Sequence, residues 1–487
     1  MINVADVLSR LASGGLLVTP PPRTEIAITG IADDSREVRK GYLFCAIRGH
    51  RQDGHSFLEE VKQAGAAAAL VEERRSVIDL PQFRVTDGRR AASVAAHVVY
   101  GDPAAALRLV GVTGTNGKTT TVHIARHLLA GELAVGSIGT LGVVLPAGGR
   151  REGRLTTPGP IEFAAILAEM RDAGGDCVVS EVSSHALRQR RVDGASFDVA
   201  VFTNLSRDHL DYHESVEEYR DSKLRLIELV ADGGTVILIA DDPAWSGVGG
   251  ERRTVRYGAS ADADYRVEGI ELTPAGSRWT LEGAPGSFDV ELPLLGEFNV
   301  YNALAAAAAA HSLGIGMHEI VASLKEVPAV PGRLEVLSRE PLILRDYAHT
   351  PDALRRALQA LRATVVGRLI VVFGCGGDRD RGKRPLMGRV AAEGADLAIV
   401  TSDNPRNEAP EAIIDEIIPG VGAAPHERTV DRRTAIARAI ELADEGDAVL
   451  LAGKGHETYQ VVGAERRPFD EAVIVRELLE GRGAGPR

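Results

Sequence analysis

The sequence has few of the features that mark secreted, membrane or nucleic-acid-binding proteins. Its three cysteines, Cys45, Cys177 and Cys375, are too few and too scattered for a disulfide framework or a zinc site, so a reducing compartment is expected. The formal net charge of -12 disfavours nucleic acid or an anionic membrane surface as a partner. No apolar run approaches the roughly 18 residues that a membrane-spanning helix needs.

The first residues, "MINVADVLSRLASGGLLV", also lack the basic start of a signal peptide, and they contain Asp6. We therefore expect a cytoplasmic protein. The 487 residues are 44% apolar and 25% charged, which is ordinary globular composition, and the length suits about three domains of about 150 residues. No solenoid-type repeat is present.

Several apolar segments end in polar residues, which is typical of parallel α/β sheets with ligands at the carboxyl ends of their strands. The segments "LRLVGVTG", "DCVVSEVSS", "DVAVFTNLS" and "TVILIADD" predict such a sheet, and "NALAAAAAAHSLG" predicts a tightly packed, buried helix. Between Tyr265 and Leu295 the pattern alternates with period two, which predicts short antiparallel strands. Beyond "EVPAVPGRLEV", three further strand-and-loop units predict a Rossmann-like domain. The fold class is therefore α/β, and the predicted domains are 1–102, 103–333 and 334–487.

The stretch "GVTGTNGKTTT" lies between a predicted strand and a predicted helix and is typical of a phosphate-binding loop. Gly114 and Gly117 let the backbone turn its N–H groups toward a polyphosphate. Lys118 would reach the β and γ oxygens, and Thr119 would help hold Mg²⁺. The spacing departs from the common P-loop because Val112 stands where that pattern has glycine. The alternative is a glycine-rich turn with an incidental lysine.

This loop resembles the nucleotide loop of the Mur ligases, the ATP-dependent amino-acid ligases of peptidoglycan precursor synthesis, to which folylpolyglutamate synthetases are related. Matching motifs extend from Ser35 to Glu457 and cover essentially the whole chain. The resemblance implies a UDP-binding N-terminal domain, a central P-loop ATPase domain, a C-terminal amino-acid-binding domain, and ATP with Mg²⁺ as cofactors. The ATP-binding residues that it implies are Gly114, Thr115, Asn116, Gly117, Lys118, Thr119, Thr120, Asn204, Asn299, Arg333 and Asp346.

A polar loop, "NLSRDHLDYHES", and a carboxylate at a strand end, Glu181, offer oxygen and nitrogen ligands of the kind that Mg²⁺ can use. An exposed polar loop without a metal is the alternative. The resemblance assigns the metal to Thr119, Glu181, His209 and Lys223, and catalysis to Lys118, Glu181, His209 and Lys223.

In similar enzymes the lysine matching Lys223 is carbamylated, although an ordinary helix lysine is solvated. For Asn299, which would read the adenine, the alternative is a helix N-cap before "VYNALAAAA".

The UDP-sugar and its peptide are expected at motifs that turn formation could also explain. "ADDSREV" contains Ser35 and "RGHRQDG" contains His50. The residues that the resemblance assigns to the UDP-muramoyl-dipeptide are Ser35, His50, Thr156, Thr157, Ser183, Gln189 and Arg191.

The stretch "TSDNPRNE" matches the signature of family members that add meso-diaminopimelate, whereas lysine-adding relatives lack its arginine. Diaminopimelate carries a second carboxylate at its far end, which a planar arginine can bind and which lysine does not have. An Asx-turn with a solvated Arg406 is the alternative. The residues assigned to this amino acid are Arg379, Asp403, Asn404, Pro405, Arg406, Gly453 and Glu457.

The expected function is ATP-dependent ligation of meso-2,6-diaminopimelate to the D-glutamate of UDP-N-acetylmuramoyl-L-alanyl-D-glutamate through an acyl phosphate. The same ligase adding L-lysine is one alternative. A switch that binds ATP without ligating anything is the other. We expect a monomer that has neither nucleic acid nor membrane as a partner.

Overall fold

Parallel sheets organise the chain, as its strand-and-loop pattern predicts. The computed structural model describes residues 2–49, 52–210, 212–284 and 286–483. It separates into two compact units, which consist of residues 1–266, 283–285 and 304–320, and of residues 267–282, 286–303 and 321–487. Within the described residues, no helix combines the length and the apolar character that crossing a membrane requires.

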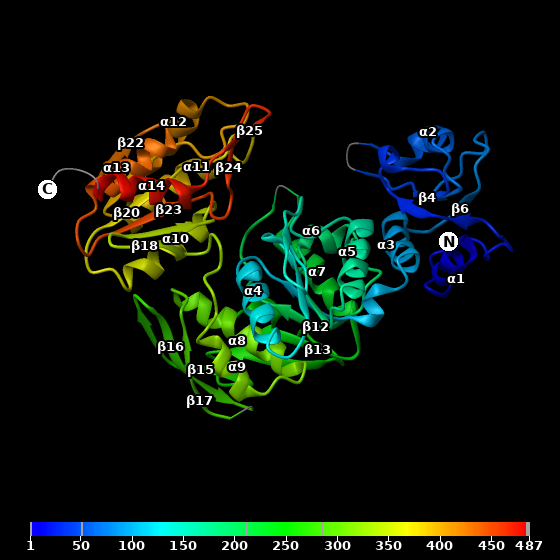
Figure 1. The fold of residues 1–487 in the computed structure, drawn as a ribbon, viewed down its shortest axis with the longest axis horizontal. Helices are drawn as coiled ribbons and strands as arrows, with labels where there is room; N and C mark the ends of the chain where they lie inside the picture. The colour runs from blue at the N-terminus through cyan, green and yellow to red at the C-terminus, as the bar shows by residue number, and fades with distance from the viewer. Residues whose placement is uncertain (1, 50–51, 211, 285, 484–487) are drawn as a thin grey trace. The chain divides into compact units, whose positions relative to one another are not determined.

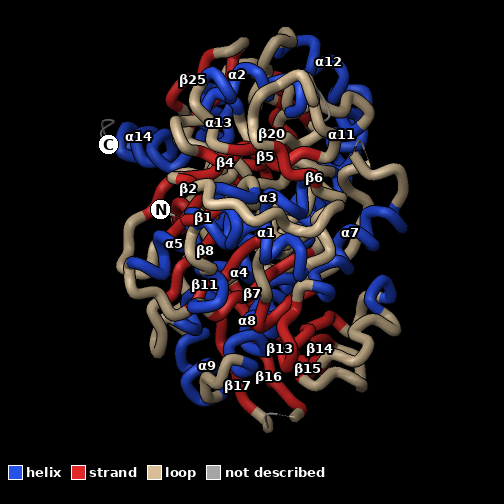
Figure 2. The backbone as a smooth tube through the Cα atoms, turned by 90° about the vertical axis from the view of Figure 1, so that its right-hand side faces the viewer, coloured by secondary structure: helices blue, strands red, loops and turns tan. Residues whose placement is uncertain are grey.

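The N-terminal part of the first unit is a four-stranded parallel sheet between helices. Its strands, in order, are β3 (Gly30–Ala32), β4 (Tyr42–Cys45), β5 (Ala68–Val71) and β6 (Gln82–Arg84). Figure 2 shows α1 (Val4–Ser13) and α3 (Gly88–Val99) on one side of these strands and α2 (Leu58–Gln63) on the other. Successive side chains of β4 point to opposite faces of the sheet, so Leu43 and Cys45 enter one core and Phe44 enters the other. The short β1 (Ile2–Asn3) pairs with β2 (Ala27–Ile28).

The second sheet of this unit places three strand ends side by side. The first eight strands of this eleven-stranded sheet, in order, are β10 (Arg150–Arg151), β9 (Gly142–Val144), β8 (Val135–Gly139), β11 (Cys177–Glu181), β7 (Arg108–Thr113), β12 (Phe197–Phe202), β13 (Val230–Ile239) and β14 (Arg253–Gly258). From β8 to β14 the pairing is parallel. Glu181 pairs with Val112 and Phe202 with Thr113, so the carboxyl ends of β11, β7 and β12 lie at one edge. The connecting helices are α4 (Lys118–Leu129), α5 (Pro160–Asp172), α6 (Ser184–Arg188) and α7 (Val216–Glu228).

The predicted antiparallel section is present, with one difference at its start. β16 (Gly276–Gly283) pairs antiparallel with β17 (Phe288–Leu292), but the first residues of β15 (Tyr265–Thr273) pair parallel with β14. Two helices follow, α8 (Glu297–Ser312) and α9 (Met317–Leu324). The alanines of α8 are fully buried, which confirms the predicted packed helix.

The C-terminal part is the predicted Rossmann-like sheet. Its strands, in order, are β18 (Glu335–Arg339), β19 (Leu342–Asp346), β23 (Ala448–Ala452), β20 (Leu369–Phe373), β21 (Leu397–Val400) and β22 (His426–Arg428), all parallel except β18. The helices on one face are α10 (Pro351–Arg362), α11 (Lys383–Gly394) and α12 (Pro410–Val421), and those on the other are α13 (Arg432–Leu442) and α14 (Glu471–Gly483) (Figure 1). A hairpin of β24 (Tyr459–Val462) and β25 (Glu465–Pro468) follows β23.

Candidate active site

The glycine-rich loop between β7 and α4 has the backbone that a phosphate-binding loop needs. Gly114 and Gly117 have φ angles of 142° and 88°, a region that side chains rarely enter. A Cβ atom at Gly114 would lie 1.8 Å from Thr203 Oγ1, so only glycine fits there. Lys118 begins α4, and its Nζ donates to the carbonyls of Gly114 (2.9 Å) and Thr115 (2.8 Å). The start of α4 therefore adjoins the Lys118 cation, and this arrangement suits a polyphosphate.

The segment after β12 holds this loop in place. Thr115 N donates to Asn204 O (2.7 Å), and Asn116 N donates to Asn204 Oδ1 (3.2 Å). Thr203 Oγ1 donates to Asn116 O (2.7 Å), and Ser206 N donates to Thr115 Oγ1 (3.0 Å). Asn204, which the family resemblance assigns to ATP, thus contacts the loop directly.

Glu181 is a buried carboxylate, 1% exposed, at the end of β11. It accepts hydrogen bonds from Thr119 Oγ1 (3.2 Å), Thr140 N (2.7 Å) and Thr140 Oγ1 (3.2 Å). The structure thus brings together Thr119 and Glu181, two of the predicted metal ligands. Thr140, which also contacts Glu181, was not predicted from the sequence. A carboxylate beside hydroxyl groups suits Mg²⁺. Within the described residues, no group of three or more histidine, cysteine, aspartate or glutamate side chains could hold a metal by itself.

Lys223 is buried rather than solvated, so the solvated alternative is wrong. Its side chain on α7 is 1% exposed, and Nζ donates to Gly114 O (2.7 Å) and lies 4.3 Å from the ring centre of Tyr219. Burial, with a smaller contribution from the charge of Lys118, lowers the pKa of the Lys223 amine well below its ordinary value. The position therefore favours the neutral amine that carbamylation requires.

The loop with His209 lies against the first turn of α6. The rings of His209 and His185 meet edge to face with centres 4.8 Å apart, and His185 stacks on Tyr212 at 4.1 Å. His209 Nε2 is 3.6 Å from Asp208 Oδ2, and its backbone is left-handed with a φ of 52°. Asp211, in the same loop, lies outside the described residues.

Four of the residues predicted to bind the muramoyl-peptide form one hydrogen-bonded group. Thr157 Oγ1 donates to Glu181 O (2.8 Å) and accepts from Ser183 N (3.0 Å). Arg191 Nη1 donates to Thr157 O (2.7 Å), and Arg191 Nη2 donates to Gln189 Oε1 (2.8 Å). The group is thus built on the same strand end as the carboxylate of Glu181.

Thr140 contacts both Glu181 and Thr156, a further residue predicted to bind the muramoyl-peptide. Its hydroxyl lies 3.2 Å from Thr156 Oγ1 as well as from Glu181. Ser35 lies in a short 3₁₀ turn, Ser35–Glu37, which the side chain of Asp34 caps. His50 falls outside the described residues.

In the second unit, Asn299 lies inside α8 and is not its N-cap, so that alternative is wrong. The side chain is 1% exposed, and its Nδ2 donates to Leu295 O (2.8 Å), while its Oδ1 accepts from Asn302 Nδ2 (3.0 Å). An N-cap side chain would instead accept a backbone N–H.

Arg333 and Asp346 lie close together at the end of β19. The guanidinium of Arg333 lies 4.8 Å from the ring centre of Tyr347, and Asp346 Oδ2 accepts from Leu334 N (2.7 Å). Burial raises the pKa of Asp346, and the charge of Arg333 partly opposes that rise.

The predicted amino-acid site contains a buried lysine that sequence reasoning missed. Lys454 is 0% exposed, and its Nζ donates to Asn404 Oδ1 (3.2 Å) and Glu457 Oε2 (3.2 Å). Asn404 Nδ2 donates to the same glutamate oxygen (2.9 Å). Lys454 lies between the predicted residues Gly453 and Glu457, and only its burial distinguishes it from an ordinary solvated lysine.

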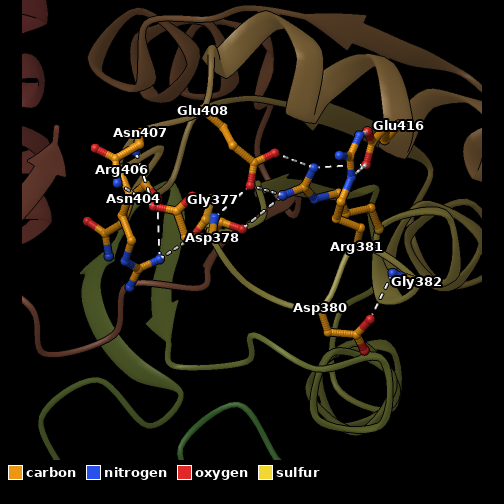
Figure 3. Close-up of polar contacts among 12 residues, drawn as sticks. Gly377, Asp378, Asp380, Arg381, Gly382, Asn404, Arg406, Asn407, Glu408 and Glu416 are labelled. Carbon is orange, nitrogen blue, oxygen red and sulfur yellow. Dashed lines mark hydrogen bonds and ion pairs between the residues drawn. The ribbon is translucent and has the colours of Figure 1, made fainter. Parts of the chain in front are cut away.

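Arg406 is half-buried and hydrogen-bonded rather than solvated. Its Nη1 donates to Gly377 O (2.8 Å) and, at 3.5 Å, to Asn404 O, and Figure 3 shows these three residues side by side. Among residues 2–49, 52–210, 212–284 and 286–483, no partner occupies its Nε or Nη2. That edge of the guanidinium is the fork that binds a carboxylate. Arg379 is exposed on the same loop as Gly377.

Close backbone packing explains the glycines of this site. A Cβ atom at Gly453, where φ is 114°, would lie 2.6 Å from Asp403 Oδ2, and one at Gly377 would lie 1.9 Å from Pro405 O. All seven predicted amino-acid-binding residues therefore follow the carboxyl ends of β20, β21 and β23, three strands of one parallel sheet.

Comparison with known proteins gives matches along the chain. Three family models match: the Mur ligase family catalytic domain at residues 27–108, the Mur ligase middle domain at 112–310 and the Mur ligase glutamate ligase domain at 332–455. Two relatives named UDP-N-acetylmuramoyl-L-alanyl-D-glutamate--2,6-diaminopimelate ligase come from Gloeobacter violaceus and Geobacillus kaustophilus. The first is 45% identical over 94% of this chain and 95% of its own, and the second is 44% identical over 94% and 96%.

Solved structures of Mur ligases also match this chain. A structure with the same ligase name is 33% identical, covers 96% of this chain and 97% of its own, and gives a TM-score of 0.70. The MurF ligase of Thermotoga maritima in complex with ADP shares the fold, with 22% identity, a TM-score of 0.64, and coverage of 94% of this chain and 99% of its own. Similarity at this level over nearly the full length leaves one conclusion: the chain belongs to the Mur ligase family.

Proposed function

We propose that this chain joins meso-2,6-diaminopimelate to the D-glutamate of UDP-N-acetylmuramoyl-L-alanyl-D-glutamate and converts ATP to ADP and phosphate. The observation that carries the proposal is the geometry of Arg406. Its Nη1 is held on Gly377 O, and its Nε and Nη2 edge has no partner in the described part of the chain. The names of relatives that are 45% and 44% identical support the same substrate.

The charges of the amino-acid site suit the far end of diaminopimelate, which carries both a carboxylate and an ammonium group. Arg406 offers a fork to the second carboxylate of diaminopimelate, and Glu457 offers an oxygen to its ammonium. Lys454 and Asn404 hold one oxygen of Glu457 and so orient the other. Lysine lacks the second carboxylate, so its ammonium would face an uncompensated arginine.

The chemistry requires that one carboxylate become a leaving group. A γ-carboxylate oxygen of the dipeptide attacks the γ-phosphorus of ATP, so that an acyl phosphate forms and ADP leaves. The amine of diaminopimelate then attacks the acyl carbon, the bond from that carbon to the phosphate oxygen breaks, and the amine loses a proton. Lys118 supplies positive charge to the phosphoryl group when its Nζ moves from the loop carbonyls to the phosphate.

The residues around Glu181 fit a magnesium ion. Thr119 and Glu181 would hold it, and when bound it would neutralise phosphate charge. Lys223 is the residue that we expect to be carbamylated, since its neutral amine can attack CO₂, form an N–C bond and release a proton. The carbamate would place a negative group beside the phosphate loop, where Nζ now contacts Gly114 O.

The three-domain boundaries at 102 and 333, the cytoplasmic location and the monomeric state stay predictions. The nucleotide-linked substrates favour the location. The match of Ser35, in the turn between β3 and β4, to the family's UDP-binding motif supports a UDP-binding role for residues 1–102.

Phosphate release in the presence of ATP, Mg²⁺ and the UDP-muramoyl-dipeptide tests the proposal. We expect release to depend on the dipeptide and on diaminopimelate, and to be slow with L-lysine. Fast release with lysine would favour the lysine-adding alternative. ATP binding without amino-acid-dependent release would favour the nucleotide switch.

A further inference from the structure

A buried arginine beside the amino-acid site binds two carboxylates. The side chain of Arg384, in the first turn of α11, is 0% exposed. Its Nη1 and Nη2 donate to the two oxygens of Glu408 at 2.9 and 2.8 Å, and Nη1 also donates to Glu416 Oε2 at 2.8 Å. A buried guanidinium needs such pairing, and a two-pronged contact fixes the orientation of the Glu408 carboxylate.

Glu408 extends this pairing to the loop of Arg379. Its Oε1 accepts a hydrogen bond from Asp378 N at 2.6 Å, and Figure 3 shows the carboxylate of Glu408 between Asp378 and the cluster around Glu416. Glu408 also lies only two residues after Arg406 in the chain. One carboxylate therefore connects the loop after β20 with the loop after β21.

Further contacts tie the same two loops together. Gly377 N donates to Asn404 O (2.9 Å), Arg406 Nη1 donates to Gly377 O (2.8 Å), and Asn407 Nδ2 donates to Asp378 Oδ2 (2.7 Å). The positions of Arg406 and of the loop that carries Arg379 are thus determined jointly.

The backbone of both loops is strained at the contact. Asp378 and Arg406 have left-handed φ angles of 51° and 53°. For residues other than glycine this conformation is unfavourable, and it persists only where surrounding contacts determine it. The pairing of Glu408 with Arg384 and Asp378 N is such a contact.

We infer that Glu408, held by Arg384, is a positioning residue for amino-acid selection, because it fixes the two arginines of the site relative to each other. The inference rests on the proposed function. The carboxylate of Glu408 is taken up by Arg384 and by the backbone of Asp378, which suits a positioning role.

Glu416 supplies a matched control. It pairs with the same Arg384 and with Arg381, but its described contacts do not include the backbone of either loop. Glu416→Gln therefore weakens the pairing of Arg384 but leaves the contacts between the two loops intact. Glu408→Gln weakens the same pairing and also alters the contact with Asp378 N. Both variants preserve side-chain size, and a thermal melt of each shows whether it is folded.

The test measures KM for diaminopimelate, ATP and the UDP-muramoyl-dipeptide, and the rate ratio of diaminopimelate to lysine. We expect Glu408→Gln to raise the diaminopimelate KM about tenfold or more, since small misplacements of binding groups have effects of this size. The rate ratio of diaminopimelate to lysine should fall as this KM rises. The KM values for ATP and the UDP-muramoyl-dipeptide should stay within about twofold of the wild type. Glu416→Gln should leave all three within about twofold.

Equal effects of the two variants on the diaminopimelate KM would overturn the inference, as would no effect of Glu408→Gln or a joint rise of all three KM values. A wild-type enzyme inactive with diaminopimelate would instead refute the proposed function. Glu408→Asp, which keeps the charge, should recover part of the diaminopimelate KM in a folded protein, and failure to recover any would count against positioning by the carboxylate.

Discussion

Replacing Arg406 by alanine removes the group that we expect to recognise the distal carboxylate of diaminopimelate. The guanidinium is half-buried, and its free edge can make two charge-assisted hydrogen bonds. Hydrogen bonds to charged groups contribute about 1.5–3 kcal/mol each, and partial exposure to water reduces that contribution. A combined loss of about 2–3 kcal/mol corresponds to a KM increase of about 30- to 150-fold for diaminopimelate.

The assay is the steady-state KM for all three substrates, with the thermal melt as a measure of folding. Arg406→Ala also leaves Gly377 O without its donor, so some loss of stability accompanies the change. Arg406→Lys keeps the charge but not the fork, so it should recover binding only in part. Arg428→Ala, which removes an exposed arginine paired with Asp415, is the control and should leave KM unchanged. An unchanged diaminopimelate KM in Arg406→Ala would refute the reasoning.

Three further predictions concern charged residues other than Arg406. Lys118→Ala should lower kcat by about 10²-fold or more, as loss of a group that stabilises transition-state charge does, and single-turnover phosphate release would check it. Lys223→Ala should be nearly inactive and regain activity with added short carboxylates, while wild-type enzyme in ¹³C-bicarbonate should give a carbamate NMR signal that the variant lacks. Pairing with Arg384 and with Asp378 N lowers the pKa of Glu408 from 4.5 to about 2. The contribution of ionised Glu408 to the stability of the folded protein should be fully present above pH 4.5 and lost as the pH falls toward 2. Acid unfolding of Glu408→Gln should lack this pH-dependent loss.

Sequence patterns predicted the parts of the fold whose signal is local. Apolar runs that end in polar residues gave β7, β11, β12, β20, β21 and β23 and placed their loops at the carboxyl edges of two parallel sheets. The phosphate loop was equally clear because glycine spacing, a lysine and a helix start occur within a few residues. The family resemblance then supplied residues, such as Ser183 and Gln189, that no local pattern distinguishes from ordinary turns.

Burial of charge could not be predicted in the same way. Lys223 lies on a helix with mostly polar neighbours, yet Tyr219, Lys223 and Leu226 share the spacing of a buried face, which was the available signal. Lys454 and Arg384 are buried and contact residues distant in sequence, Asn404 and Glu408, so these contacts depend on tertiary structure. Thr140 contacts Glu181 for the same reason, across neighbouring strand ends.

The central claim is that the chain adds diaminopimelate, and a competition in one tube tests it most directly. The enzyme is given ATP, Mg²⁺, the UDP-muramoyl-dipeptide, and equal concentrations of meso-diaminopimelate and L-lysine, and the tripeptide products are separated by mass. We expect the diaminopimelate product to dominate by at least about tenfold in the wild type, and this excess to shrink in Arg406→Ala. A wild-type mixture with as much lysine product, or with neither product, would contradict it.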